Sequence, residues 1–272
     1  MEMTQASEPA ERLPRLDTEG TPPNDGPSTP AGLAEAARYA LAGRVAYDLL
    51  HKINNLLVGV VSGAGAAESL CTLSELRRVL GASANHGREI ANLLKSFSRL
   101  FDVPDTEREP GGVDLTDVID GALFLCRNRL IRGGFVVKRH DEELPPPRGD
   151  LGPMLRILLE VIYSAVDALP HGGTLELVGR HSAASVTLTV AASKVTPGRA
   201  SNILAALRQA QSGCDCRLGS GGAPEAAYQL GLIAAQVAAR QYGGELTAEM
   251  QASRRLSFTL TVPKWQESAG VR

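Results

Sequence analysis

The chain has 272 residues, of which 43% are hydrophobic, enough apolar material for one large core or two smaller ones. Its formal net charge of -2, without a basic run or stripe, speaks against nucleic acid or an anionic membrane surface as a partner. The N-terminus lacks a basic segment followed by an apolar one, and no window reaches the about 18 uninterrupted apolar residues of a membrane span. We therefore expect a cytoplasmic protein that does not enter a membrane.

The chain contains four cysteines, too few and too scattered for a disulfide framework. Cys214 and Cys216 are separated by one residue in a Gly-rich stretch, a spacing compatible with a metal or a labile disulfide. Because no second ligand pair of matching spacing exists, we expect no metal on this chain.

The N-terminal third divides into a tail and a helical region. Residues 1–30 hold six prolines among small polar and acidic residues and almost no large aliphatics, which predicts a disordered tail. Residues 31–103 favour two long helices, and Thr72 with Glu75 three residues later forms a capping box that begins the second one. Two helices with wide apolar faces cannot bury both faces alone. The economical solution is a homodimer that closes a four-helix bundle.

Within the first helix, the segment Tyr47 to Val61 combines an apolar stripe with one histidine. His51 lies about 200° around the helix from Leu49, which predicts a solvent-facing imidazole. Asn55 follows one turn later on the same side. The stripe consists of Val45, Leu49, Ile53, Leu56 and Val60.

The rest of the chain changes to a mixed pattern. Residues 104–112 predict a linker, residues 113–265 a single α/β two-layer sandwich domain, and residues 266–272 a short tail. Helices are expected over 115–130, 151–169 and 224–242, and strands over 135–139, 174–179, 186–190 and 256–262.

This order of elements and three motifs, over roughly residues 36 to 263, resemble the transmitter region of bacterial sensor histidine kinases. That region joins a dimerisation and histidine-phosphotransfer hairpin to the ATPase-type sandwich shared with gyrase and the Hsp90 chaperones. HKINNLL, residues 51–57, is similar to the phosphoacceptor segment, with His51 as the phosphoacceptor. LLEVIYSAVDAL, residues 158–169, and LGLIAAQVAARQYGGEL, residues 230–246, resemble two segments of the nucleotide domain.

The nucleotide motifs depart from the family pattern where they matter chemically. The resemblance places two asparagines, one a Mg²⁺ ligand, where this chain has Glu160 and Ser164. The adenine-binding Asp-x-Gly-x-Gly stretch has Ala192, Lys194 and Thr196 at its three motif positions. Of a later glycine pair only Gly231 remains. Mg²⁺ needs oxygen ligands and close backbone approach needs glycine, so we expect a degenerate fold without ATP binding.

Lys52 follows the histidine directly, where the resemblance implies an acidic residue that assists autophosphorylation. A lysine there weakens autokinase chemistry. It is a candidate site residue that attracts a phosphoryl group or the acidic pocket of a receiver domain.

These features predict a phosphorelay histidine phosphotransferase. His51 would accept a phosphoryl group from a receiver aspartate and pass it to another receiver, with Asn55 beside it and Mg²⁺ only in the receiver. Partners would be response-regulator receiver domains, a hybrid histidine kinase and a second copy of the chain. Three alternatives stay open: an active kinase with a divergent ATP site, a receiver phosphatase that uses Asn55, and a non-catalytic adaptor that sequesters a response regulator.

Overall fold

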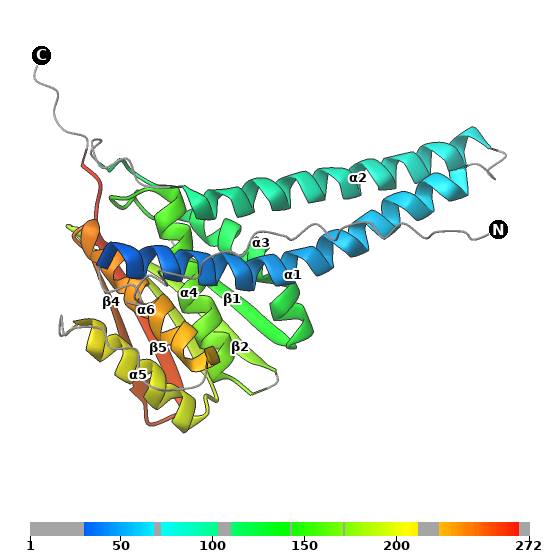
Figure 1. The fold of residues 1–272 in the computed structure, drawn as a ribbon. Coiled ribbons are helices and arrows are strands. Elements are labelled where there is room, and N and C mark those ends of the chain that lie inside the picture. Colours follow the sequence, from blue (N-terminus) through cyan, green and yellow to red (C-terminus); the bar gives the residue numbers. More distant parts are fainter. Residues whose placement is uncertain are drawn as a thin grey trace, which may run out of the picture.

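A computed structural model describes residues 30–67, 72–102, 110–141, 143–170, 172–211 and 223–266. A long helical hairpin projects from an α/β sandwich (Figure 1). The predicted tails, apart from Pro30 and Gln266, and most of the predicted linker lie outside the described residues, as do Cys214 and Cys216.

The hairpin consists of α1 (Pro30–Ala67) and α2 (Leu73–Ser98), followed by the short 3₁₀ helix η1 (Arg99–Phe101). Thr72 caps α2 as predicted: the Glu75 backbone N–H donates to Thr72 Oγ1 at 3.3 Å, and the Thr72 hydroxyl donates to Glu75 Oε2 at 2.5 Å. Helix α1 continues through Gly63 and Gly65 to Ala67, although glycine is a poor helix former.

Small residues set the close approach of the two hairpin helices. A Cβ atom at Gly59 would lie 2.6 Å from His86 Nδ1 on α2, and one at Gly63 would lie 2.6 Å from Ser83 Oγ. Because Gly59 and Gly63 carry no side chain, His86 and Ser83 of α2 can pack closely against α1. His86 accordingly lies against α1, partly buried, and away from solvent.

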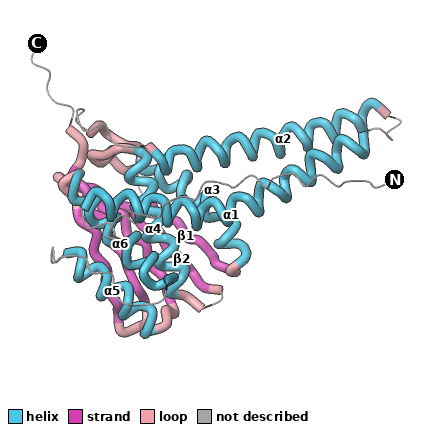
Figure 2. Tube along the Cα trace, viewed as in Figure 1, coloured by secondary structure: helices cyan, strands magenta, loops and turns pink. Residues whose placement is uncertain are grey.

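The sandwich contains a five-stranded sheet in the order β1-β2-β3-β5-β4, in which only β1 and β2 are parallel. Every helix and strand predicted beyond residue 113 is present (Figure 2). Two elements were not predicted from the sequence: helix α5 and strand β4. The elements are α3 (Leu115–Arg132), β1 (Phe135–Asp141), α4 (Leu151–Ala168), β2 (Gly173–His181), β3 (Ser185–Ser193), α5 (Pro197–Gln211), α6 (Ala223–Gln241), β4 (Glu245–Gln251) and β5 (Arg255–Pro263).

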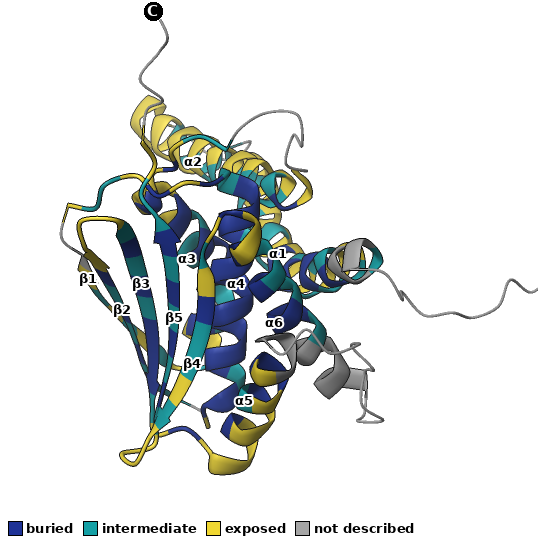
Figure 3. Ribbon diagram, turned by 90° about the vertical axis from the view of Figure 1, so that its left-hand side faces the viewer, coloured by how far each residue is buried: buried dark blue, intermediate teal, exposed yellow. Residues whose placement is uncertain are grey.

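Helices cover one face of the sheet (Figure 3). Along β5 the buried residues alternate with half-buried polar ones, since successive side chains of a strand point to opposite faces. The inward set is Leu256, Phe258, Leu260 and Val262, and the outward set is Ser257, Thr259 and Thr261. The sequence pattern of this strand alone therefore fixes which face meets the helices.

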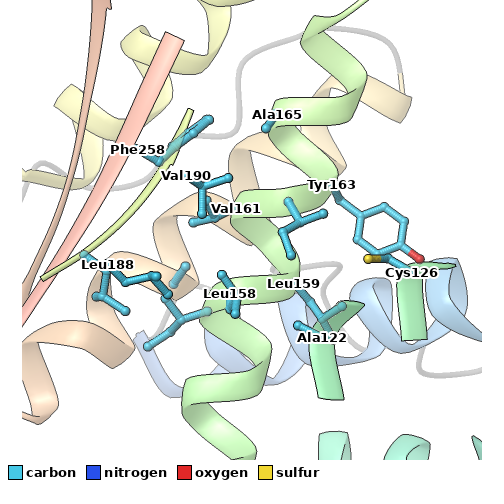
Figure 4. Close-up of a cluster of buried hydrophobic side chains, with 14 of the residues drawn as sticks. Ala122, Cys126, Leu158, Leu159, Val161, Tyr163, Ala165, Leu188, Val190 and Phe258 are labelled. Carbon is cyan, nitrogen blue, oxygen red and sulfur yellow. The ribbon is translucent and has the colours of Figure 1, made fainter. Parts of the chain in front are cut away.

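Helix α4 forms the centre of the domain. Leu158 and Val161 contribute to a buried cluster with Leu188, Val190 and Phe258 of the sheet, and Tyr163 lies beside Cys126 of α3 (Figure 4). Fully burying an aliphatic side chain of this size stabilises a fold by about 1.5–3 kcal/mol. Because α4 is buried nearly all round, it can hold charged side chains only where they are paired.

The hairpin and the sandwich share one hydrophobic core. Buried Leu41, Val45 and Leu49 of α1, with Leu93 and Leu100 of the α2–η1 region, belong to the same cluster as α3 and α4. Arg156 of α4 also donates to the backbone carbonyls of Leu100 at 2.9 Å and Asp102 at 2.8 Å.

The end of the predicted linker belongs to the sandwich. The Gly149 N–H donates to the Gly111 carbonyl at 2.9 Å, and Gly112 bridges to Arg148. Within the described residues, no helix is long and apolar enough to cross a membrane.

Candidate functional site

His51 lies on the exposed surface of α1, just beyond the part of that helix that packs on the sandwich. Asn55, one turn later, is exposed as well. Val45 and Leu49 of the predicted stripe are buried, and Ile53 and Leu56 pack partly buried against the same core. Since the stripe holds α1 in place, the rotation of the helix that leaves His51 in solvent is fixed by packing.

Two large exposed side chains flank His51 on the same face of α1. Tyr47, one turn before the histidine, is 75% exposed, and Val58, two turns after it, is 63% exposed. Exposed aromatic and aliphatic side chains beside a polar group are typical of a surface that a protein partner covers. We call the surface of Tyr47, His51, Asn55 and Val58 the histidine face.

A second set of exposed apolar side chains runs along the hairpin, on a different side of α1 from His51. Leu73, Leu80 and Leu94 of α2 and Phe101 of η1 recur at multiples of seven residues, a spacing that keeps residues on one side of a supercoiled helix. On α1, Leu50, Leu57 and Val61 lie at least 60° around the helix from His51. We call these seven residues the heptad stripe. It is separate from the histidine face.

Lys52 has contacts that the sequence did not predict. Its ammonium group lies 2.5 Å from Glu89 Oε1 on α2 and 5.2 Å from the centroid of the Phe124 ring on α3. The side chain is only 17% exposed. Lys52 therefore joins three helices, and its charge is paired with Glu89.

Glu160 fills the position that the resemblance assigns to a nucleotide-site asparagine. This residue of α4 is 4% exposed, and its carboxylate pairs with the Arg44 guanidinium of α1. A Cβ atom at Gly231 of α6 would overlap that carboxylate, so Gly231 is needed here for close packing. Burial raises the pKa of Glu160, and Arg44 opposes that rise. Beside Gly231, the Glu160 carboxylate thus occupies the space between α4 and α6.

Tyr163 continues this contact one turn along α4. Its ring contacts two guanidinium groups, with Arg44 Cζ 5.0 Å and Arg129 Cζ 4.9 Å from the ring centroid. Its hydroxyl donates to Asp48 Oδ2 of α1 at 2.9 Å. Burial and the Asp48 carboxylate raise the pKa of Tyr163, which keeps the hydroxyl protonated and able to donate.

Sequence reasoning missed Arg44, Asp48 and Tyr163. The signal was present: Arg44 and Asp48 lie four residues apart, and both flank the apolar stripe of α1. Charged residues at such positions need partners of opposite charge on the opposing element. Asn128 of α3 adds to the contact by donating to the Asp48 backbone carbonyl at 3.3 Å.

The other degenerate positions have structural contacts. Ser164 is buried at 1% exposed, and Ala192 is fully buried in the sheet. Thr196 donates from its hydroxyl to the Ala168 carbonyl at 2.9 Å, which ties the end of β3 to the end of α4. Lys194 has φ 68°, the left-handed conformation that favours glycine, at the position of a motif glycine. The backbone there keeps a glycine conformation that its side chain no longer favours.

The structure also describes two further histidines and one cysteine in the sandwich. His140 and His181 are exposed on the sandwich, and His171 lies outside the described residues. Burial raises the pKa of the Cys126 thiol to about 12, so that thiol stays protonated. Among the described residues, no cluster of three or more His, Cys, Asp or Glu side chains could hold a metal ion.

Comparison with known proteins finds sensor kinases. The chain is 28% identical over 142 residues to the sensory histidine kinase/phosphatase NtrB of Rhodobacter capsulatus, which covers 52% of this chain and 39% of that protein. It is 24% identical over 158 residues to the sensor kinase CckA of Brucella abortus, covering 55% and 16% respectively. The chain thus spans well under half the length of these relatives.

No family model matches the chain. Among solved structures, the catalytic domain of the histidine kinase ThkA aligns with a TM-score of 0.45 at 15% identity, covering 59% of this chain and all of that domain. The sequence relatives and the order of helical hairpin and α/β sandwich confirm the predicted resemblance to the transmitter region of sensor histidine kinases.

Proposed function

We propose that the protein is a phosphorelay histidine phosphotransferase whose phosphoacceptor is His51, and that it works without ATP. The observation that carries this proposal is a contrast between two sites. His51 is exposed on a helix fixed by packing, whereas Glu160, at a position that corresponds to the nucleotide site, pairs with Arg44 of α1 and packs against Gly231.

The reaction would consist of two reversible transfers. A neutral imidazole nitrogen of His51 attacks the phosphorus of an aspartyl phosphate in the first receiver. The P–N bond forms, the P–O bond to the aspartate breaks, and the imidazolium that results loses the proton on its other ring nitrogen to solvent. A carboxylate of the second receiver then attacks the same phosphorus and displaces the imidazole, which regains a proton. Mg²⁺ would be held in the receiver, where oxygen ligands surround the aspartate.

The histidine face supplies the contacts that this chemistry needs. Tyr47 and Val58 offer apolar area on both sides of the imidazole, and Asn55 offers an amide that can donate to a phosphoryl oxygen. Lys52 is held by Glu89, so its proposed part is to fix the helices rather than to attract the phosphoryl group.

A homodimer would cover the heptad stripe. Leu94 and Leu80 are about half exposed on the single chain, and both lie in a row with Leu73 and Phe101. An identical hairpin related by a twofold axis would bury this row and form a four-helix bundle, as the sequence predicts. The histidine face lies outside the heptad stripe and would stay accessible to receivers.

The experiment uses receiver domains of the source organism labelled with [³²P]acetyl phosphate. Mixed with the full-length dimer, they should pass acid-labile label to the wild-type protein and to the His140→Ala variant, which loses another exposed histidine. They should not label His51→Ala. Label on His51→Ala at the wild-type level contradicts the proposal, and labelling by [γ-³²P]ATP alone indicates an active kinase instead.

The name of the kinase/phosphatase relative suggests a second function for the histidine face, hydrolysis of the receiver phosphate. Asn55, exposed beside His51, would then orient a water molecule for hydrolysis of the receiver phosphate. This activity predicts that Asn55→Ala slows loss of receiver phosphate in a His51→Ala background. An unchanged rate in that background excludes it.

A further inference from the structure

We infer that Arg44 and Asp48 form a lock that holds the sandwich in one orientation against α1, and that both are positioning residues for the reaction at His51. The lock consists of four contacts between α1 and the helices of the sandwich: Arg44 with Glu160, Arg44 with the Tyr163 ring, Asp48 with the Tyr163 hydroxyl, and Asp48 with Asn128.

The contacts are directional and buried. Asp48 is 6% exposed and Glu160 is 4% exposed, so water cannot replace their partners. A hydrogen bond to a charged group is stronger than one between neutral groups and is lost when its geometry changes. An apolar contact between α1 and α4 alone would tolerate sliding or rotation of one helix on the other. The ion pair and the hydrogen bond, one turn apart on both helices, permit a single register.

The lock acts at two levels of the hairpin. Asp48 follows Arg44 by four positions, and His51 follows Asp48 by three. The locked segment therefore ends about one helical turn before the phosphoacceptor. At the other side, Arg156 of α4 holds the end of α2 and η1 through the carbonyls of Leu100 and Asp102. Both hairpin helices are therefore attached to the same helix of the sandwich.

The lock also places α3 next to the histidine face. Phe124 of α3 lies under Lys52, and Asn128 donates to the backbone carbonyl of Asp48, so α3 follows α1 over the turn from Asp48 to Lys52, which contains His51. A protein that reaches His51 meets both helices. In a kinase, the nucleotide domain must carry ATP to the histidine. Here the corresponding positions anchor the domain in place, and the domain becomes a fixed part of the docking surface.

The last step rests on the proposed function, because it takes the docking partner to be a receiver. A fixed arrangement of α1 and α3 lowers the concentration of receiver needed for transfer. If release of the lock leaves the docking arrangement populated about one tenth of the time, the half-saturating receiver concentration rises about tenfold. The maximal transfer rate changes little, because His51 and its phosphoryl chemistry are untouched.

The experiment measures orientation and transfer separately. Spin labels are attached at Ala82→Cys on α2 and Ala184→Cys before β3, both exposed positions, in a full-length chain with Cys71, Cys214 and Cys216 replaced by serine. Labelled chains are diluted with unlabelled ones, so that the distance within one protomer is read. The buried Cys126 stays in place.

The test variant is Arg44→Met with Glu160→Gln, which removes both charges and leaves neither one buried alone. Arg44→Lys keeps the charge, and Arg38→Met is the matched control, since Arg38 pairs with Glu35 within α1. The lock predicts a broader distance distribution and an about tenfold higher half-saturating receiver concentration for the double variant, and parent values for Arg38→Met. Partial recovery is expected for Arg44→Lys.

Each outcome has one meaning. A folded double variant with the parent distance distribution overturns the lock, whatever its transfer kinetics. A broadened distribution with unchanged half-saturation keeps the lock and removes the sandwich from the docking surface. If the parent protein accepts no phosphate, the proposed function fails, while the distance distributions still test the lock.

Discussion

The Arg44 guanidinium of α1 pairs with the Glu160 carboxylate of α4 at a position where the sequence resemblance expects an asparagine of a nucleotide site. Arg44 and Glu160 thus connect the phosphoacceptor helix to the centre of the sandwich. The pair explains how a transmitter-like chain can retain its sandwich after its nucleotide motifs have changed. The Arg44–Glu160 pair fixes the sandwich and the helix that carries His51 to each other.

Removing Arg44 is expected to be costly for stability. Arg44→Ala leaves the buried Glu160 carboxylate without its counter-charge and should lower the free energy of unfolding by about 3–5 kcal/mol at pH 7.5. Arg44→Met with Glu160→Gln leaves no buried charge unpaired and should cost about 2 kcal/mol or less. Urea unfolding followed by circular dichroism measures both, and equal losses in the two variants contradict the pair.

The Arg44→Ala loss should depend on pH with a definite sign. Burial raises the folded-state pKa of Glu160, and without Arg44 nothing comparable opposes that rise. The protonated carboxyl is then favoured by folding, so its contribution is present below the unfolded pKa and is lost as pH rises through the folded pKa. The difference in unfolding free energy between wild type and Arg44→Ala should therefore be larger at pH 7.5 than at pH 5. A difference in unfolding free energy that is larger at pH 5 than at pH 7.5 rules out the assignment.

The heptad stripe predicts where the dimer can be broken. Leu94→Asp places a charge in the centre of the proposed bundle and should shift the protein to monomers at micromolar concentration, as measured by sedimentation velocity. Asn92→Asp, on an exposed part of α2 about 200° around the helix from Leu94, is the control and should leave the dimer intact. A Leu94→Asp protein that sediments as wild type places the interface elsewhere.

The Lys52 and Glu89 pair predicts a rescue by exchange of charges. Lys52→Glu puts two carboxylates together and should lower the unfolding free energy by about 1 kcal/mol, a modest value because both side chains are partly exposed. Lys52→Glu with Glu89→Lys should recover most of this loss, as read from thermal unfolding. Phosphotransfer through His51 should persist in the double variant. Loss of transfer with full recovery of stability would instead give the Lys52 charge the role predicted from the sequence.

Lys194 offers a stabilising substitution. Its φ of 68° costs an L-amino acid about 1 kcal/mol relative to glycine, whereas glycine gives up more freedom on folding. Lys194→Gly should therefore raise the midpoint of thermal unfolding slightly. Lys138→Gly, in the interior of β1, lowers it under the same conditions. A Lys194→Gly protein that melts below wild type shows that side-chain contacts outweigh the backbone conformation.

Much of the fold followed from the sequence because the relevant signals are local. The capping box at Thr72 and Glu75, the period of two along β5 and the apolar length of α4 each specify an element without reference to distant residues. Helix α5 was missed because Pro197, Gly198 and Arg199 begin it without an apolar period. Strand β4 was missed because Glu245, Glu249 and half-buried Thr247 give it the composition of a loop.

The site was only partly predictable for the same reason. The exposure of His51 follows from helical period, and the structure places it as expected. The partners of Lys52 and Glu160 lie 37 and 116 residues away in the chain, on elements whose relative placement no local pattern records. Such contacts depend on how α1, α3 and α4 pack together. A single sequence can reveal that a charged residue needs a partner, but not which residue supplies it.

The most direct test of the central claim is the transfer of label from a ³²P-phosphorylated receiver to the full-length protein in the absence of nucleotide. The account predicts acid-labile label on the wild type and on His140→Ala within the time of one receiver turnover, and none on His51→Ala. Label that persists on His51→Ala, or that appears on the wild type only when ATP is added, contradicts it.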